Sequence, residues 1–162
     1  MPKPVTNIVV AGLGGQGVLR ATDILADVCL RAGFDVKKSE IKGMSQRGGS
    51  VTSDVRFGDR VLSPMVAPGE ADYLVVLEAT QVEPHRHFLK AGGCLLVPSA
   101  VDPAKLANRK SFNVAMLGAL SAHLPMSEAT WSEALRRAFP EEFHAANQQA
   151  LIVGRQSQST PA

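Results

Sequence analysis

The sequence predicts an α/β fold with three layers, a mostly parallel sheet that contains one antiparallel hairpin, and a helical C-terminal part. Three observations lead to this prediction. Short apolar runs bounded by glycine are typical of strands that are buried on both faces. A glycine turn joins the first of these runs to an amphipathic helix, and helical periodicity dominates the last third of the chain.

The first quarter of the chain predicts a strand, a turn, a helix and a second strand. Residues 7–12 (NIVVAG) form a continuous apolar run that ends in glycine, as buried strands do. From Gly17 apolar residues recur at helical spacing until Gly33 ends the helix. Residues 34–40 then resume as a strand. This order is a βαβ unit, so we expect a Rossmann-like sheet.

The next segment predicts the antiparallel hairpin. Residues 50–57 (SVTSDVRF) alternate between apolar and polar side chains, which is the period of a strand with one buried face. Gly58 and Asp59 follow as a tight reversal into residues 60–64, so we expect these two segments to pair with each other. Further strands are expected at 73–77 and 94–97 with a polar helix between them, and further helices at 112–124, 127–139 and 140–153.

Length and composition predict one cytoplasmic domain. The chain has 162 residues, 45% hydrophobic and 20% charged, and we expect a single domain over residues 1–155 with a flexible polar tail over 156–162. The 17 Lys and Arg are scattered among 15 Asp and Glu, which argues against a nucleic-acid partner. No segment has the apolar length of a signal peptide or a membrane span, so we expect no membrane partner.

The first glycine-rich motif is a candidate anion site. Residues 12–17 (GLGGQG) match G-x-G-x-x-G between a predicted strand and a predicted helix, where the backbone can approach an anion and the helix N-terminus attracts it. A second interpretation is purely structural, because glycine also permits a tight turn and close packing of the helix on the strand. If the ligand were NAD, Glu40 would bind the ribose hydroxyls, although Lys37, Lys38 and Lys42 surround it.

The second glycine-rich motif lies in residues 39–58 (SEIKGMSQRGGSVTSDVRFG). The backbone N–H groups of Gly48 and Gly49 can form an anion-binding nest, Arg47 can clamp a phosphate or carboxylate, and Gln46 and Ser50 add donors. We expect this loop to lie beside the first motif at the carboxyl edge of the sheet. Alternatively, the loop docks a partner subunit and Arg47 pairs with a carboxylate there.

The two motifs together resemble the gamma-type domain of 2-oxoacid:ferredoxin oxidoreductases, the pyruvate/ketoisovalerate oxidoreductase family. The resemblance covers about residues 7–154. The second motif is most similar to that of the subunits that act on aryl 2-oxoacids such as indolepyruvate or phenylglyoxylate. Further matching features are Ser63-Pro64, the run 69–78 (GEADYLVVLE), the run 113–118 (NVAMLG), Asn147 and Gly154.

The resemblance implies a complex in which thiamine diphosphate with magnesium and iron–sulfur clusters oxidatively decarboxylate a 2-oxoacid, pass electrons to ferredoxin or another acceptor, and form an acyl-CoA. Two lone cysteines, Cys29 and Cys94, cannot supply the four thiolates of a cluster, so we place these cofactors on larger partner subunits. The crevice of this chain would face the phosphates of coenzyme A or the substrate entrance. The predicted cofactor-binding residues are Gly12, Gly14, Gly15, Gln16, Gly17, Glu40, Gln46, Arg47, Gly48, Gly49 and Ser50.

The sequence therefore predicts a small subunit, without a bound cluster, of an aryl 2-oxoacid oxidoreductase complex. A stand-alone NAD(P)-binding oxidoreductase and a pure assembly module are the alternatives. We expect no catalytic residue and no metal ligand in the chain, since His85 and His87 lie in a polar helix without further ligands. The serines lack the G-x-S-x-G context of a nucleophile.

Overall fold

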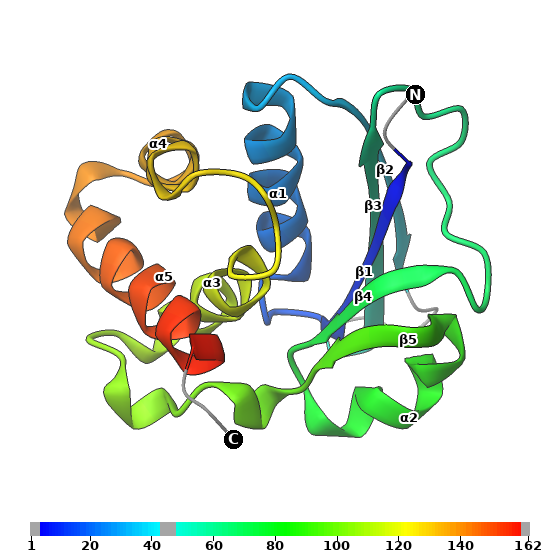
Figure 1. The fold of residues 1–162 in the computed structure, drawn as a ribbon. Coiled ribbons are helices and arrows are strands. Elements are labelled where there is room, and N and C mark those ends of the chain that lie inside the picture. The colour runs from blue at the N-terminus through cyan, green and yellow to red at the C-terminus, as the bar shows by residue number, and fades with distance from the viewer. Residues whose placement is uncertain (1–3, 43–47, 160–162) are drawn as a thin grey trace.

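The computed structural model of the chain describes residues 4–42 and 48–159, arranged as a mixed sheet with helices packed mainly on one face (Figure 1). The sheet has five strands in the order β2-β3-β1-β4-β5. The α/β fold, the parallel core of the sheet and the helical C-terminal part are confirmed. The strands are β1 (Thr6–Leu13), β2 (Asp35–Lys42), β3 (Ser50–Gly58), β4 (Ala71–Val76) and β5 (Leu89–Leu96), and the longer helices are α1 (Val18–Arg31), α3 (Phe112–Ser121), α4 (Glu128–Ala138) and α5 (His144–Ser159).

The predicted hairpin is wrong in its pairing. β3 does not pair with residues 60–64; instead it pairs antiparallel with β1 along one edge and with β2 along the other. Both edges of β3 are therefore occupied, and residues 60–64 have no strand partner and leave the sheet. β1, β4 and β5 form the parallel part of the sheet. β2, which follows β1 and α1 along the chain, runs parallel to β1 but is separated from it by β3.

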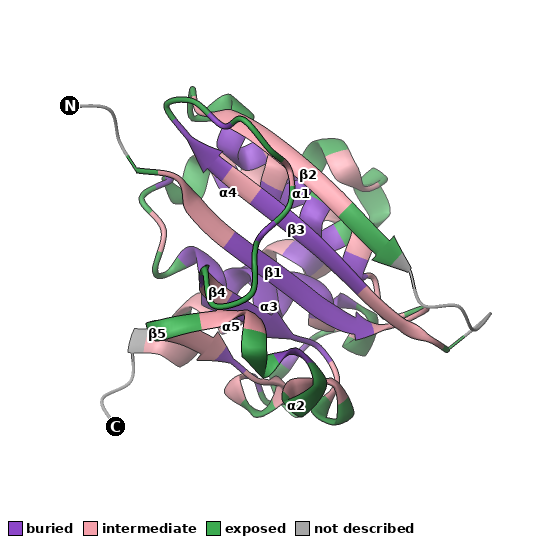
Figure 2. Cartoon of the chain, turned by 90° about the vertical axis from the view of Figure 1, so that its right-hand side faces the viewer, coloured by how far each residue is buried: buried purple, intermediate pink, exposed green. Residues whose placement is uncertain are grey.

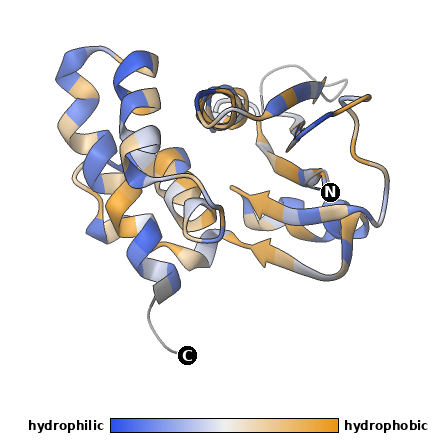
Figure 3. Ribbon diagram, turned by 45° about the horizontal axis from the view of Figure 1, so that its top comes forward, coloured by the Kyte–Doolittle hydropathy of each residue, from blue (hydrophilic) through white to orange (hydrophobic). Residues whose placement is uncertain are grey.

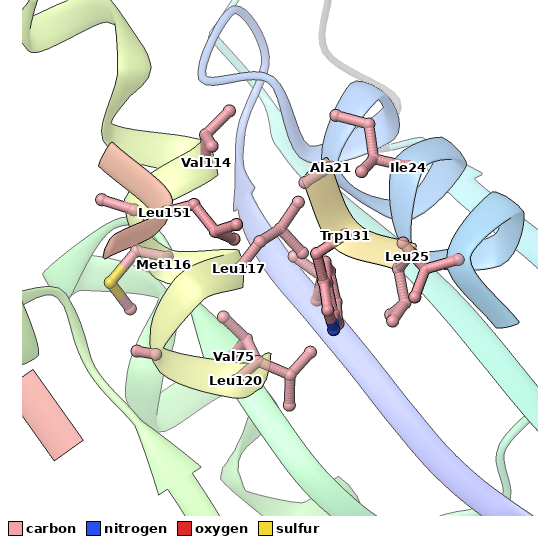
Figure 4. Packing of buried hydrophobic residues seen from close by; sticks show 14 of the residues in the cluster. Ala21, Ile24, Leu25, Val75, Val114, Met116, Leu117, Leu120, Trp131 and Leu151 are labelled. Atoms are coloured by element: carbon pink, nitrogen blue, oxygen red, sulfur yellow. The ribbon is translucent and has the colours of Figure 1, made fainter. Parts of the chain in front are cut away.

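The main hydrophobic core lies between the sheet and the layer of α1, α3, α4 and α5. α3 is buried on all sides, whereas α4 has one buried face, and Ser127 caps α4 by accepting a hydrogen bond from Thr130 N at 3.2 Å. Trp131 of α4 is 0% exposed and lies between Leu117 of α3 and Leu25 of α1 (Figure 4). Figure 3 shows the same partition, with hydrophobic residues in the strands and hydrophilic residues on the helices farthest from them.

The opposite face of the sheet is covered by a thinner layer. The short helix α2 (Val82–His85) and the 3-10 turn η2 (Arg86–Phe88) pack on β4 through Val82 and Phe88. The loop of residues 59–70 crosses β3 and β1 on this face (Figure 2). Side chains of the strands fasten the loop: Asp54 Oδ2 accepts from Val66 N at 2.9 Å, and Arg56 Nη1 donates to Ser63 O at 2.7 Å. These contacts complete the predicted three layers.

The last helix approaches α3 so closely that two glycines are required at the crossing. A Cβ built at Gly154 of α5 would overlap the backbone of Ala115, and one built at Gly118 of α3 would overlap the backbone of Leu151. The two helix backbones are thus in direct contact. α5 also continues to Ser159, so the first four residues of the predicted tail are helical, while residues 160–162 lie outside the described part of the chain.

Replacing Gly154 by alanine should lower the free energy of unfolding by about 3 kcal/mol, the upper end of the usual cost of overpacking, because a rigid backbone blocks the new methyl group. Denaturant unfolding followed by circular dichroism measures this change. Ala145→Ser, which adds one atom at an exposed position of the same helix, is the control and should be nearly neutral. Equal stability of the two variants would contradict the observed helix crossing.

Asp54 should make stability depend on pH. The residue is 4% exposed, and burial raises the pKa of its carboxyl, an effect that the hydrogen bond from Val66 N and the charge of Arg56 only partly oppose. The folded protein then holds this proton more tightly than the unfolded chain, so ionisation of Asp54 lowers stability as the pH rises through the raised pKa. Asp54→Asn keeps an oxygen for Val66 N and should raise the unfolding free energy at pH 7.

The advantage of Asp54→Asn should shrink as the pH falls below about 4, where the carboxyl is protonated in both states of the wild-type protein. Chemical denaturation at several pH values gives the difference. A variant that is less stable than the wild type at pH 7 would show that the ionised carboxylate is a net stabilising group.

Candidate functional site

Three loops meet at the carboxyl ends of β1 and β4. The turn of residues 12–17 leaves β1, and residues 77–81 leave β4. Since β3 runs antiparallel, its first residue, Ser50, pairs with Leu13 and brings the end of the second glycine-rich loop to the same edge. The chain leaves β1 toward one face of the sheet and β4 toward the other, and such points in open α/β sheets form ligand crevices. The sequence prediction that both motifs share one edge agrees with this geometry.

Most amides of the first glycine turn already have acceptors within the protein. Leu13 N donates to Gln16 Oε1 at 2.7 Å, Gln16 N to Leu13 O at 3.1 Å, and Gly14 N to Gly49 O at 2.8 Å. Within the described residues, the amides of Gly15 and Gly17 have no acceptor. A bound anion would therefore have two free amides in this turn and the uncapped first turn of α1.

Gly17 has a packing role as well as a conformational one. Its φ of 80° lies in the left-handed region, and a Cβ at this position would overlap the amide of Asn113. Asn113 Nδ2 donates to Gly17 O at 3.3 Å and so joins α3 to the turn. The N-cap residue of α3 is Ser111, so Asn113 lies in the first turn of this helix.

Side chains from the loop after β4 complete the site. Gln16 Nε2 donates to Glu78 Oε2 at 2.9 Å, and Ser50 Oγ donates to Gln81 Oε1 at 2.7 Å. The four side chains hold the three loops in a fixed relation. Sequence reasoning missed Glu78 and Gln81, although a polar residue directly after a buried apolar run signals the carboxyl edge of the sheet.

The predicted residues are only partly brought together. The glycine turn, Gly48, Gly49 and Ser50 meet at the carboxyl edge, whereas Gln46 and Arg47 lie outside the described residues. Glu40 lies away from this edge. It pairs with Ser53 of β3, and Ser53 pairs with Val10 of β1. Glu40 is therefore two strands away from β1, at the level of a residue three positions before the end of that strand. Its carboxylate forms an ion pair with Lys38.

A cavity of about 440 Å³ opens beside the glycine turn. The 3-10 turn η5 (Arg109–Ser111) forms one wall with Arg109 and Lys110, and Gly15 lies on the wall of the glycine turn. Sequence reasoning missed these two cations, because only the tertiary structure brings residues so distant along the chain to this crevice.

The described residues contain no group of three or more His, Cys, Asp or Glu that could hold a metal ion. His85 is buried, and its Nδ1 lies 2.8 Å from Gln81 O. Both cysteines are free, and burial raises the pKa of Cys29 to about 12 and that of Cys94 above its ordinary value. These thiols are not poised as thiolate ligands, so the described residues do not fit an iron–sulfur cluster. No helix in the described ranges is long and apolar enough to span a membrane.

Comparisons with known proteins identify the family of this chain. The family model described as pyruvate ferredoxin/flavodoxin oxidoreductase matches residues 7–157. Indolepyruvate oxidoreductase subunit IorB of Thermococcus kodakarensis is 32% identical over 91% of this chain and 93% of its own length. The corresponding subunit of Pyrococcus horikoshii is 42% identical over 60% of this chain and 48% of its own length.

Solved structures have the same fold. The gamma subunit of a keto/oxoacid ferredoxin oxidoreductase from Geobacter sulfurreducens superimposes with a TM-score of 0.81 at 26% identity, covering 95% of this chain and 98% of that one. A 2-oxoglutarate:ferredoxin oxidoreductase from Magnetococcus marinus has a TM-score of 0.84 at 23% identity, covering 98% of this chain but 32% of that longer one. The chain thus belongs to the pyruvate ferredoxin/flavodoxin oxidoreductase family, as a gamma-type subunit of a 2-oxoacid:ferredoxin oxidoreductase.

Proposed function

We propose that this chain is the small subunit, without a cluster of its own, of a complex that oxidatively decarboxylates an aryl 2-oxoacid such as indolepyruvate to an acyl-CoA. The proposed substrate class is supported by the alignment of this chain with an indolepyruvate oxidoreductase subunit over nearly the full length of both chains. Thiamine diphosphate with magnesium and iron–sulfur clusters on larger subunits supply the decarboxylation and the electron transfer to ferredoxin or another acceptor.

The contribution of this chain is the crevice at the carboxyl edge of its sheet. We assign to it the backbone of Gly48 and Gly49 and the amides of Gly15 and Gly17, which have no acceptor in the described part of the chain. Gln16 and Ser50 hold these loops in place. Gln46 and Arg47 remain predicted parts of the same crevice. A site with unpaired amides at a helix N-terminus suits the phosphates of coenzyme A, and the 2-oxoglutarate enzyme with this fold was solved with coenzyme A bound.

An assembly module is the second candidate function, and the packing of the glycine turn favours it. Three of the turn's amides already donate within the protein, and Gly12 and Gly17 are packed against Gln16, Val18 and Asn113. The NAD-binding alternative has less support, because Glu40 lies away from the turn where a ribose hydroxyl would have to be.

The subunit hypothesis predicts co-purification of this chain, tagged in its native cell, with a larger cysteine-rich chain that contains thiamine diphosphate. The isolated chain should not oxidise indolepyruvate, and the reconstituted complex should reduce ferredoxin with it. Activity of the isolated chain with its own bound thiamine or cluster would refute the proposal. Activity of the complex with pyruvate but not with aryl 2-oxoacids would refute only the substrate class.

Arg47→Ala separates ligand binding from assembly. If the second loop binds coenzyme A, the variant complex should assemble normally and show a KM for coenzyme A raised about tenfold, the equivalent of one charge-assisted hydrogen bond. If the loop docks the partner, subunit association should weaken while the affinity for coenzyme A stays constant. Arg137→Ala, an exposed arginine of α4, is the matched control and should change neither quantity.

A further inference from the structure

We propose that the free edge of β2 is an interaction surface for a second copy of this chain, which pairs with it strand to strand about a two-fold axis. β2 is the last strand on its side of the sheet, and within the described residues its outer edge forms no backbone–backbone hydrogen bond. Such an edge presents unpaired N–H and C=O groups and can accept a further strand. Figure 2 shows the exposed end of β2 at this edge.

The edge of β2 is more regular than the edge at the other side of the sheet. β2 pairs with β3 over all 8 of its residues, from Asp35 to Lys42, without a bulge. β5 forms the opposite edge, but its register against β4 shifts between Ala71 and Tyr73, and it contains Gly92 with a φ of 79°. Bulges and glycines bend a strand and interrupt its row of amides. Strand pairing between two copies is therefore better supported at β2 than at β5.

The side chains of β2 alternate between the two faces of the sheet. Lys38 and Glu40 lie on the face covered by α1, where Lys38 forms ion pairs with Glu40 and with Asp23 of α1. Lys37 and Ile41 lie on the opposite face, and Ile41 is 47% exposed. When two antiparallel strands are related by a two-fold axis perpendicular to the sheet, residues opposite each other lie on the same face. The register of such a pair is defined by the residue that lies on the axis, opposite its own copy.

The charges of β2 favour the register with Ser39 on the axis. Lys38 and Ser39 are the two central residues of the strand, so registers centred on them pair the most residues. With Lys38 on the axis, two ammonium groups would face each other, which is unfavourable. With Ser39 on the axis, Lys38 of each copy faces Glu40 of the other, and since Lys38 also contacts Glu40 of its own strand, the four charges alternate in a closed network.

The same register also matches the other face of the strand. Lys37 of each copy lies opposite Ile41 of the other, and the aliphatic stem of the lysine can cover this exposed apolar side chain. Lysine on an edge strand commonly prevents pairing. Here Lys37 and Lys38 each face a side chain of the second copy that suits them, so the pairing is complementary to itself.

The pairing would join the two sheets into one and leave both functional edges accessible. β2 runs parallel to β1, and the two-fold axis reverses the second copy, so the two glycine turns lie at opposite ends of the joined sheet. An interface made mainly by one strand of each copy is smaller than the roughly 1,200 Å² of a stable dimer. We therefore expect the isolated chain to dimerise with a Kd of about 10 to 100 µM.

Disulfide trapping of the full chain tests the register. Ser39→Cys should form a cross-linked dimer on mild oxidation, because opposite residues of an antiparallel pair have Cα atoms about 4.5 to 5.5 Å apart, within the range of a disulfide. Lys37→Cys and Ile41→Cys should each stay monomeric, because each lies about 13 Å from its own copy along the strand. The double variant Lys37→Cys/Ile41→Cys should cross-link. The wild-type chain, which retains Cys29 and Cys94, is the control and should stay monomeric.

Sedimentation equilibrium tests the contribution of the charges. Glu40→Lys replaces two facing ion pairs by two repulsive pairs and should weaken the dimer roughly tenfold. Glu142→Lys, the same change at an exposed residue of η6 (Glu141–Phe143), is the matched control and should leave the affinity unchanged. Cross-linking of Ser39→Cys no faster than that of Lys37→Cys, equal affinities of the two lysine variants, or a wild-type chain that is monomeric at millimolar concentration would each overturn the proposal. These results do not depend on co-purification with larger subunits.

Discussion

β3 lies between β1 and β2 and pairs with both along its length, and the arrangement of the functional edge depends on this insertion. Because β3 runs antiparallel to its neighbours, the loop that precedes it ends beside the glycine turn, where Gly49 O accepts a hydrogen bond from Gly14 N. The same insertion moves Glu40 two strands away from the turn. It also occupies both edges of β3, so the following loop must cross the open face of the sheet, where Asp54 and Arg56 hold it.

Asn113 and the crossing with α5 fix the position of α3 relative to this edge. Asn113 at the start of α3 contacts Gly17, and the rest of α3 is fixed by the close approach of α5 at Gly118 and Gly154. η5, which directly precedes α3, is thereby held over the glycine turn. Arg109 and Lys110 reach the crevice for this reason, so a change in the packing of the terminal helix would move the two cations relative to the turn.

The glycine turn serves structure and site at once. Its amides at Leu13, Gly14 and Gln16 donate inside the protein, and those of Gly15 and Gly17 have no acceptor among the described residues. Gln16 is central to this division, since its oxygen accepts from Leu13 N while its nitrogen donates to Glu78. A turn that is fixed by its own side chain and by two neighbouring loops is preorganised, which lowers the entropic cost of binding a ligand or a partner.

Local patterns in the sequence determined the fold class and the buried strands, because periodicity and glycine act over a few residues. They also determined the two motifs and, through them, the family. Only the tertiary structure decided which strands are neighbours, because residues 50–57 could pair with any free edge and the hairpin was merely the shortest connection. The same limit applies to Glu78, Asn113, Arg109 and Lys110: their positions in the site depend on contacts between segments up to about a hundred residues apart, which no local spacing specifies.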